Sequence, residues 1–147
     1  MSVNVSASVV IEATPEEVFQ FVIDPINEPK WRLKSVESGL KTEGPMRVGT
    51  VGYSKAEVGR GKIDSIDWKV TKLENNKHAT WDLLTGPLEG TGGYLVEPVN
   101  GGTKFTLEAH VRMKGPLGFL MAPIVKMIGG KMNKADVANL KKVTESK

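Results

Sequence analysis

The chain has 147 residues, which is enough for one domain of ordinary size with its own hydrophobic core. Hydrophobic residues make up 39% of the chain and charged residues 25%, a balance typical of globular proteins. The absence of cysteine excludes disulfides, zinc ribbons, iron–sulfur clusters and thiol nucleophiles. The formal charge of +3 is too dispersed along the chain to indicate a nucleic-acid partner. We therefore expect a single domain over residues 1–147.

Neither a signal peptide nor a membrane span is expected. Residues 1–13 alternate in polarity instead of forming a continuous apolar segment. The longest nearly apolar run, residues 118–128, is about half as long as a bilayer span requires. We expect a cytoplasmic protein without stable membrane insertion.

The first elements are a strand and a short helix. Residues 4–12 alternate with the period of a half-buried strand. Thr14 and Glu17 form a capping box around a proline at the first helical position, which predicts a helix over residues 15–23. A second short helical turn should end near Trp31.

The middle of the chain follows a period of two, interrupted by glycine, proline and asparagine turn signals. The last of these segments alternates most cleanly, with Phe105 and Met113 on its apolar face. We expect strands at residues 36–40, 49–58, 62–73, 77–84, 91–97 and 103–113.

A long helix is predicted from Leu117 to about Glu145, because apolar residues recur there at spacings of three and four. Ala135 and Ala138 should continue this stripe more weakly, in a lysine-rich second half that looks solvated. The Gly129-Gly130 pair is interpreted as a hinge or as a tight packing point. The stripe consists of Leu117, Leu120, Met121, Ile124, Ile128 and Met132.

Several short motifs resemble the START-like, helix-grip superfamily (SRPBCC), within it the polyketide cyclase/dehydrase-like group. Residues 13–19 (ATPEEVF) are similar to the family's opening after its first strand, and an Asp-Pro pair followed by Trp31 resembles its short second helix. Further matches are residues 48–50, the late hairpin from residue 90 to residue 103, and the approach to the final helix at residues 115–118.

The resemblance implies an α+β helix-grip (START/Bet v 1-like) fold. A curved antiparallel sheet of six to seven strands would wrap around the long C-terminal helix, with two short helices after the first strand. Similar proteins bind lipids, sterols, quinones, plant hormones or aromatic polyketides between sheet and helix, and some are cyclases or dehydratases. The fold does not decide among these functions.

Aromatic and methionine side chains are the main candidates for a pocket that holds a flat or apolar ligand. Tyr53 and Lys55 share one face of their strand and would bind a carbonyl or phenolate oxygen if that face turns inward; the alternative is that both reach solvent. The predicted ligand-binding residues are Trp31, Tyr53, Lys55, Trp68, Trp81, Tyr94, Phe105, Met113, Met121, Ile124 and Ile128.

No metal site or cofactor is expected. His78 lies beside a turn and should be exposed, and His110 shares its strand face with charged neighbours, opposite the apolar face.

The leading hypothesis is a soluble binding protein for a small hydrophobic molecule, monomeric or weakly dimeric. The first alternative is a polyketide cyclase or dehydratase, in which Tyr53, Lys55, Glu57 or Tyr94 would supply an ionisable group. The second is a membrane-surface or protein-interaction module that uses residues 119–128 and the flanking lysines at positions 126, 131 and 134.

Overall fold

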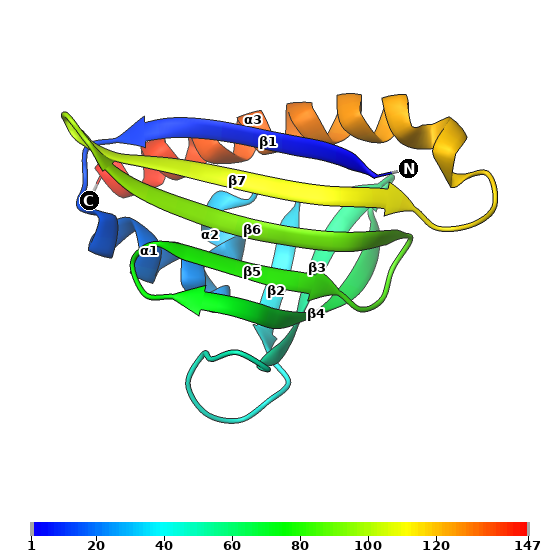
Figure 1. Ribbon diagram of the computed structural model, residues 1–147, viewed down its shortest axis with the longest axis horizontal. Helices are drawn as coiled ribbons and strands as arrows, with labels where there is room; N and C mark the ends of the chain where they lie inside the picture. The colour runs from blue at the N-terminus through cyan, green and yellow to red at the C-terminus, as the bar shows by residue number, and fades with distance from the viewer. Residues whose placement is uncertain (1, 147) are drawn as a thin grey trace.

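The computed structural model describes residues 2–146. One seven-stranded antiparallel sheet is combined with helices that cover its inner face (Figure 1). The strands are β1 (Val3–Ile11), β2 (Ser35–Leu40), β3 (Val51–Gly59), β4 (Lys62–Glu74), β5 (His78–Leu83), β6 (Leu88–Val99) and β7 (Gly102–Met113). The helices are α1 (Pro15–Ile23), the 3-10 turn η1 (Pro25–Asn27), α2 (Glu28–Trp31), the 3-10 turn η2 (Gly118–Met121) and α3 (Ala122–Glu145).

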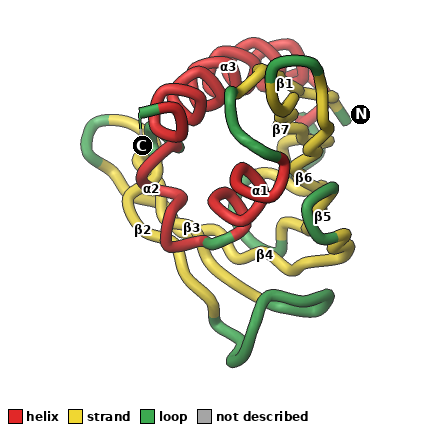
Figure 2. The backbone as a smooth tube through the Cα atoms, turned by 90° about the vertical axis from the view of Figure 1, so that its left-hand side faces the viewer, coloured by secondary structure: helices red, strands yellow, loops and turns green. Residues whose placement is uncertain are grey.

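The strand order is β1-β7-β6-β5-β4-β3-β2, so β1 pairs with the last strand while the others follow as successive hairpins. Register shifts interrupt the β2–β3, β3–β4 and β4–β5 pairs, and such bulges increase the twist of a sheet. The sheet consequently curls around α1 and α2, while α3 crosses above them beside β1 (Figure 2). This is the predicted helix-grip α+β fold.

Helix α1 begins and ends where its sequence signals predict. Thr14 accepts a hydrogen bond from the Glu17 backbone N–H, and the Glu17 carboxylate accepts one from the Thr14 backbone N–H in return. A cap of this kind stabilises a helix by about 1 kcal/mol. It places Val18, Phe19 and Val22 in the core.

Helix α3 differs from the prediction in where it is buried. It starts at Ala122, after η2, and its buried residues all lie in the second half: Asn133, Asp136, Val137 and Leu140. Ala135 and Ala138, which were expected to continue the apolar stripe, are exposed. The second half is buried because its polar residues Asp136 and Asn139 bind partners in and beside α2, as described below. No helix within residues 2–146 is both long and apolar enough to cross a membrane.

The hydrophobic core lies at one end of the sheet's inner face, where α1, α2 and the second half of α3 meet. Trp31 and Phe105 are fully buried, Tyr94 is 5% exposed, and the three rings pack at centroid distances of 5.6–5.8 Å. Each aromatic pair of this kind adds about 0.5–1.5 kcal/mol beyond its burial. These three predicted ligand contacts thus form the closed end of the domain.

Candidate functional site

The inner face of the sheet changes from buried to half-exposed along its strands. Directly paired residues point to the same face of a sheet, so the register groups Trp81 with Gly92 and Ala109, and Leu88 with Met113. Trp81, Ala109 and Met113 are half-buried, unlike the fully buried core residues farther along the same strands. The strand ends near η2 therefore present apolar side chains that the helices do not cover.

Two tryptophan rings lie close against glycines of this face. A Cβ atom on Gly92 would stand 2.6 Å from Nε1 of Trp81, and a Cβ on Gly52 would stand 2.3 Å from the Trp68 ring. Distances this short mean that any side chain at either position would displace the tryptophan ring. The missing side chains permit this close approach.

Helix α3 contributes an apolar stripe to the same space. Asn139 Nδ2 donates a hydrogen bond of 2.9 Å to the Trp31 carbonyl, which identifies the side of α3 that faces inward. Met132 and Ile128 lie seven and eleven residues earlier, two and three helical turns away, and therefore on that same side. They remain 39% and 50% exposed. Met121, half-buried, extends the stripe, and Ile124, 44% exposed, lies at its margin.

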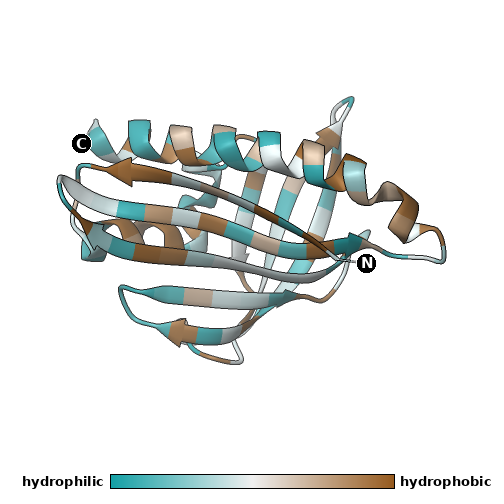
Figure 3. Ribbon diagram, turned by 45° about the horizontal axis from the view of Figure 1, so that its top comes forward, coloured by the Kyte–Doolittle hydropathy of each residue, from teal (hydrophilic) through white to brown (hydrophobic). Residues whose placement is uncertain are grey.

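We call this half-exposed region the inner apolar surface. It consists of Trp68, Trp81, Leu83, Ala109 and Met113 on the sheet and Ile128 and Met132 on α3. Figure 3 shows the long helix over the strands, with hydrophobic residues concentrated toward the start of α3.

A polar cluster borders the inner apolar surface on the β2–β3 side. Trp68 Nε1 donates to Ser54 Oγ over 2.9 Å, and Ser54 Oγ lies 3.3 Å from Ser38 Oγ. Ser38 Oγ donates to the Glu28 carboxylate over 2.6 Å. The cluster joins α2 to three strands and holds the Trp68 ring in place.

A second polar group ties α3 to the end of α2. The Arg32 guanidinium binds the Asp136 carboxylate at 2.9 Å, and the same carboxylate accepts a 3.0 Å hydrogen bond from the Leu33 backbone N–H. Asp136 is 4% exposed. Removing one partner of such a buried pair leaves an uncompensated charge, so the pair determines where α3 sits.

The Tyr94 hydroxyl lies beside this ion pair. Burial raises the pKa of Tyr94 well above its usual range, the Glu28 carboxylate adds to the shift, and Arg32 partly opposes it. Burial by itself would lower the pKa of Arg32, but Tyr94, Glu28 and Asp136 outweigh it and raise that pKa. Tyr94 is therefore a neutral hydrogen-bonding group, and Arg32 stays charged.

Tyr53 and Lys55 lie on the opposite, outer face of the sheet. They alternate with Ser54, whose hydroxyl belongs to the inner polar cluster, and so point away from it. The Tyr53 hydroxyl donates a 2.6 Å hydrogen bond to Glu37, which raises the pKa of Tyr53, and Lys55 lies near the same carboxylate. The strand register thus corrects the expectation that these two residues bind a ligand beneath α3.

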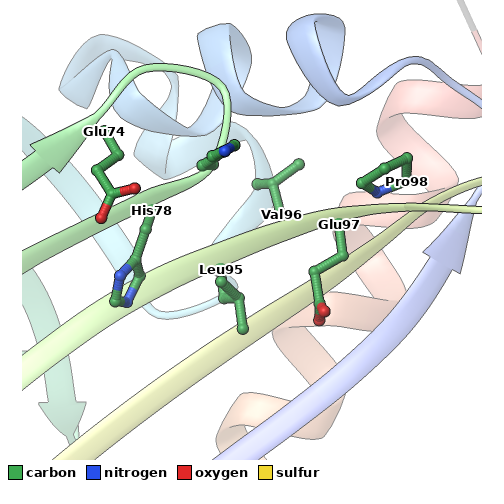
Figure 4. Close-up of a pocket in the computed structure, with 7 residues that line it drawn as sticks. Glu74, His78, Leu95, Val96, Glu97 and Pro98 are labelled. Carbon is green, nitrogen blue, oxygen red and sulfur yellow. The ribbon is translucent and has the colours of Figure 1, made fainter.

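Two hollows occur on the outer face. One, of about 300 Å³, is lined by Glu37, Lys41, Tyr53, Lys55 and Ser65. The other, of about 420 Å³, lies over β4–β6 (Figure 4) and is lined by Glu74, Lys77, His78, Leu95, Val96, Glu97 and Pro98. Charged side chains line most of the smaller hollow, whereas the larger one mixes charged and apolar residues.

His78 is less exposed than the sequence suggested. It begins β5 and is half-buried, with Nε2 3.1 Å from a Glu108 carboxylate oxygen on β7. Within residues 2–146 no group of three or more His, Cys, Asp or Glu side chains is arranged to hold a metal ion.

Comparison with known families agrees with this geometry. Residues 2–145 match the family described as "Polyketide cyclase / dehydrase and lipid transport". The chain belongs to this family. The match covers nearly the whole sequence, and it confirms the resemblance carried by the short motifs around α1, β3 and η2. No curated protein matches the sequence.

Solved structures of other proteins share this fold. TTHA0849 from Thermus thermophilus superimposes with a TM-score of 0.81 at 16% identity, over 98% of each chain. The ZhuI aromatase/cyclase from Streptomyces sp. R1128 gives a TM-score of 0.80 at 14% identity, over 99% of this chain and 94% of that chain. The di-domain aromatase/cyclase StfQ gives 0.79 at 9% identity, and this chain spans 51% of it. At these identities the likeness shows the fold alone.

Sequence reasoning missed the polar residues of the site: Glu28, Arg32, Ser38, Ser54 and Asp136. One signal was present, because Asp136 follows Met132 by four residues and so falls on the inward side of α3. The serines and Glu28 carried no such signal. Their meeting depends on the register of β2 with β3, which contains a shift between Ser35 and Glu37.

Proposed function

We propose that this member of the family binds a small apolar or aromatic molecule, lipid-like or polyketide-like, on the inner apolar surface. The observation that carries the proposal is the exposure of inward-facing apolar side chains, above all Ile128 at 50% and Met132 at 39%. Uncovered apolar area is unfavourable in water by about 25 cal/mol per Å², so a ligand that covers it would gain that free energy. The family description and the aromatase/cyclase neighbours support such a ligand.

The bordering polar cluster would orient the ligand. Trp68 and Ser54 are half-buried beside the apolar side chains, and the Ser54 hydroxyl can exchange a hydrogen bond with a carbonyl or hydroxyl group. Pockets of this composition, apolar with a few fixed polar groups, are the usual form of small-molecule sites.

We propose binding rather than catalysis as the principal role. Acid–base catalysis needs an ionisable group in contact with the substrate. On the inner face the ionisable side chains Arg32 and Asp136 are bound to each other, the Glu28 carboxylate accepts a hydrogen bond from Ser38, and Tyr94 is 5% exposed. Of the sequence-based catalytic candidates, Tyr53 and Lys55 lie on the outer face.

The test is native mass spectrometry of gently purified protein, followed by fluorescence titration with the apolar probe 1-anilinonaphthalene-8-sulfonate. Ile128→Asp places a charge on the inward side of α3 and should weaken probe binding about tenfold or more, because the charge must be desolvated. The matched control is Ile26→Asp, in η1 and 68% exposed, which should bind like wild type. Equal affinities for the two variants would refute the proposed site.

A further inference from the structure

The outward side of α3 and the turn before it carry a second apolar region, separate from the inner apolar surface. Leu117, Phe119 and Leu120 are 63%, 57% and 59% exposed, and Met127 is 57% exposed. Leu117, Phe119 and Leu120 lie in and beside η2, directly before α3. Met127 precedes Ile128 by one residue and so projects about 100° away from it around α3. We call these four residues the outer apolar patch.

Lysines surround the outer apolar patch. Lys131 and Lys134 follow Met127 by four and seven residues and share its side of α3, while Lys114 and Lys126 flank the turn. All four lysines are exposed. Within the described part of the chain, none of them forms an ion pair.

The charge around the patch has one sign over a long stretch. Between Glu108 and Asp136 the sequence contains the basic residues Arg112, Lys114, Lys126, Lys131 and Lys134 and no acidic residue. Arg112 alone is neutralised, by an ion pair with Glu89. The rest of this segment is therefore an uncompensated positive region.

We propose that the outer apolar patch and its lysines form a docking surface for an anionic lipid bilayer. A membrane surface matches both features, since apolar side chains enter the boundary between headgroups and acyl chains while lysines attract anionic headgroups. A second copy of the chain would bring the same positive charges together. A nucleic acid would offer phosphates but no apolar area to cover Phe119 and Leu120.

The outer apolar patch lies next to the uncovered end of the inner apolar surface. The start of α3 carries the outer apolar patch on one side and the inward stripe, through Ile128, on the other. A docked protein would thus hold the uncovered end of the inner apolar surface close to the bilayer, where apolar molecules are concentrated.

The test is flotation of the intact protein with vesicles of phosphatidylcholine alone and of phosphatidylcholine mixed with phosphatidylglycerol, at low and high salt. We expect binding to the mixed vesicles that weakens as salt rises. Lys126→Ala with Lys131→Ala should weaken it about 25-fold, at about fivefold for each lysine. Phe119→Ser with Leu120→Ser should weaken it by at least as much.

Control variants separate this surface from the ligand site. Ile128→Asp, which should lose probe binding, should still float with the mixed vesicles, and so should Ile26→Ser, a 68% exposed residue in η1. Circular dichroism confirms that each variant is folded. The proposal is overturned if the wild-type protein floats with neither kind of vesicle, or equally with both. It is also overturned if the Phe119 and Leu120 variant floats like wild type, or if that variant loses self-association of the chain and nothing else.

Discussion

Replacing Gly92 by alanine would insert a methyl group where the Trp81 indole now lies. The new Cβ would stand 2.6–2.8 Å from three atoms of that ring, against 3.4–4 Å for ordinary contact, so the indole must move by about 1 Å. It cannot move freely, because Trp81 also packs against Tyr94 at a centroid distance of 4.7 Å.

Overpacking of this kind costs about 1–3 kcal/mol. For a domain of this size we expect the thermal midpoint to fall by about 2–4 °C for each kcal/mol. Urea unfolding followed by circular dichroism measures the free energy, and tryptophan fluorescence reports the displaced ring. Probe affinity should also fall, since Trp81 belongs to the inner apolar surface.

The matched control is Gly130→Ala in α3. No atom lies within 4 Å of a Cβ at this position, so only helix propensity should change, with a stabilisation of about 1 kcal/mol. If Gly92→Ala leaves both the unfolding free energy and the fluorescence unchanged, the packing of Trp81 on β6 is not what requires glycine there, and the reasoning is refuted.

Three further outcomes are expected. Asp136→Ala should lower the free energy of unfolding by about 3 kcal/mol in urea titrations, because Arg32 and the Leu33 backbone N–H lose their partner; a loss below about 1 kcal/mol would contradict this role. The pKa of Tyr94 is raised, so the stabilising contribution of this tyrosine should be complete below about pH 10, the ordinary tyrosine pKa, and should decline at higher pH. Ultraviolet titration of the folded protein should find Tyr94 still protonated at the pH where free tyrosine ionises. Ionisation of Tyr94 at about pH 10 would count against its burial. Hydrogen bonds from a neighbouring lysine and from a backbone N–H in the β1–α1 connection lower the pKa of Glu145. The contribution of Glu145 to folding stability should therefore be present above the ordinary glutamate pKa and be lost as pH falls through the depressed value. Glu145→Gln should flatten the dependence of stability on pH in that acid range, and an unchanged dependence would argue against the contact.

Local signals predicted the elements because each depends on neighbours in sequence. The capping box at Thr14 and Glu17 placed α1 correctly, and the alternation from Phe105 to Met113 placed the apolar face of β7. The resemblance then ordered these elements into a helix-grip fold. Strand ends were less well predicted, as for β6, which begins three residues earlier than expected at Leu88.

The amphipathic period of α3 could not tell which of its apolar residues are covered. Ile128 and Leu140 look alike in sequence, but Leu140 is fully buried and Ile128 is half exposed. The difference arises because Asp136 and Asn139 bind groups in and beside α2, which draws the second half of the helix onto the core.

By itself, then, the sequence determined the elements, their order and the apolar faces, because hydrophobic period and capping act over a few residues. Only the tertiary structure decided which face of β3 turns inward, and so removed Tyr53 and Lys55 from the site. The physical reason is that a one-residue change of register reverses the face of every side chain in a strand. That register is set by partners distant in sequence, such as Ser38, Ser54 and Trp68, which meet only in the folded chain.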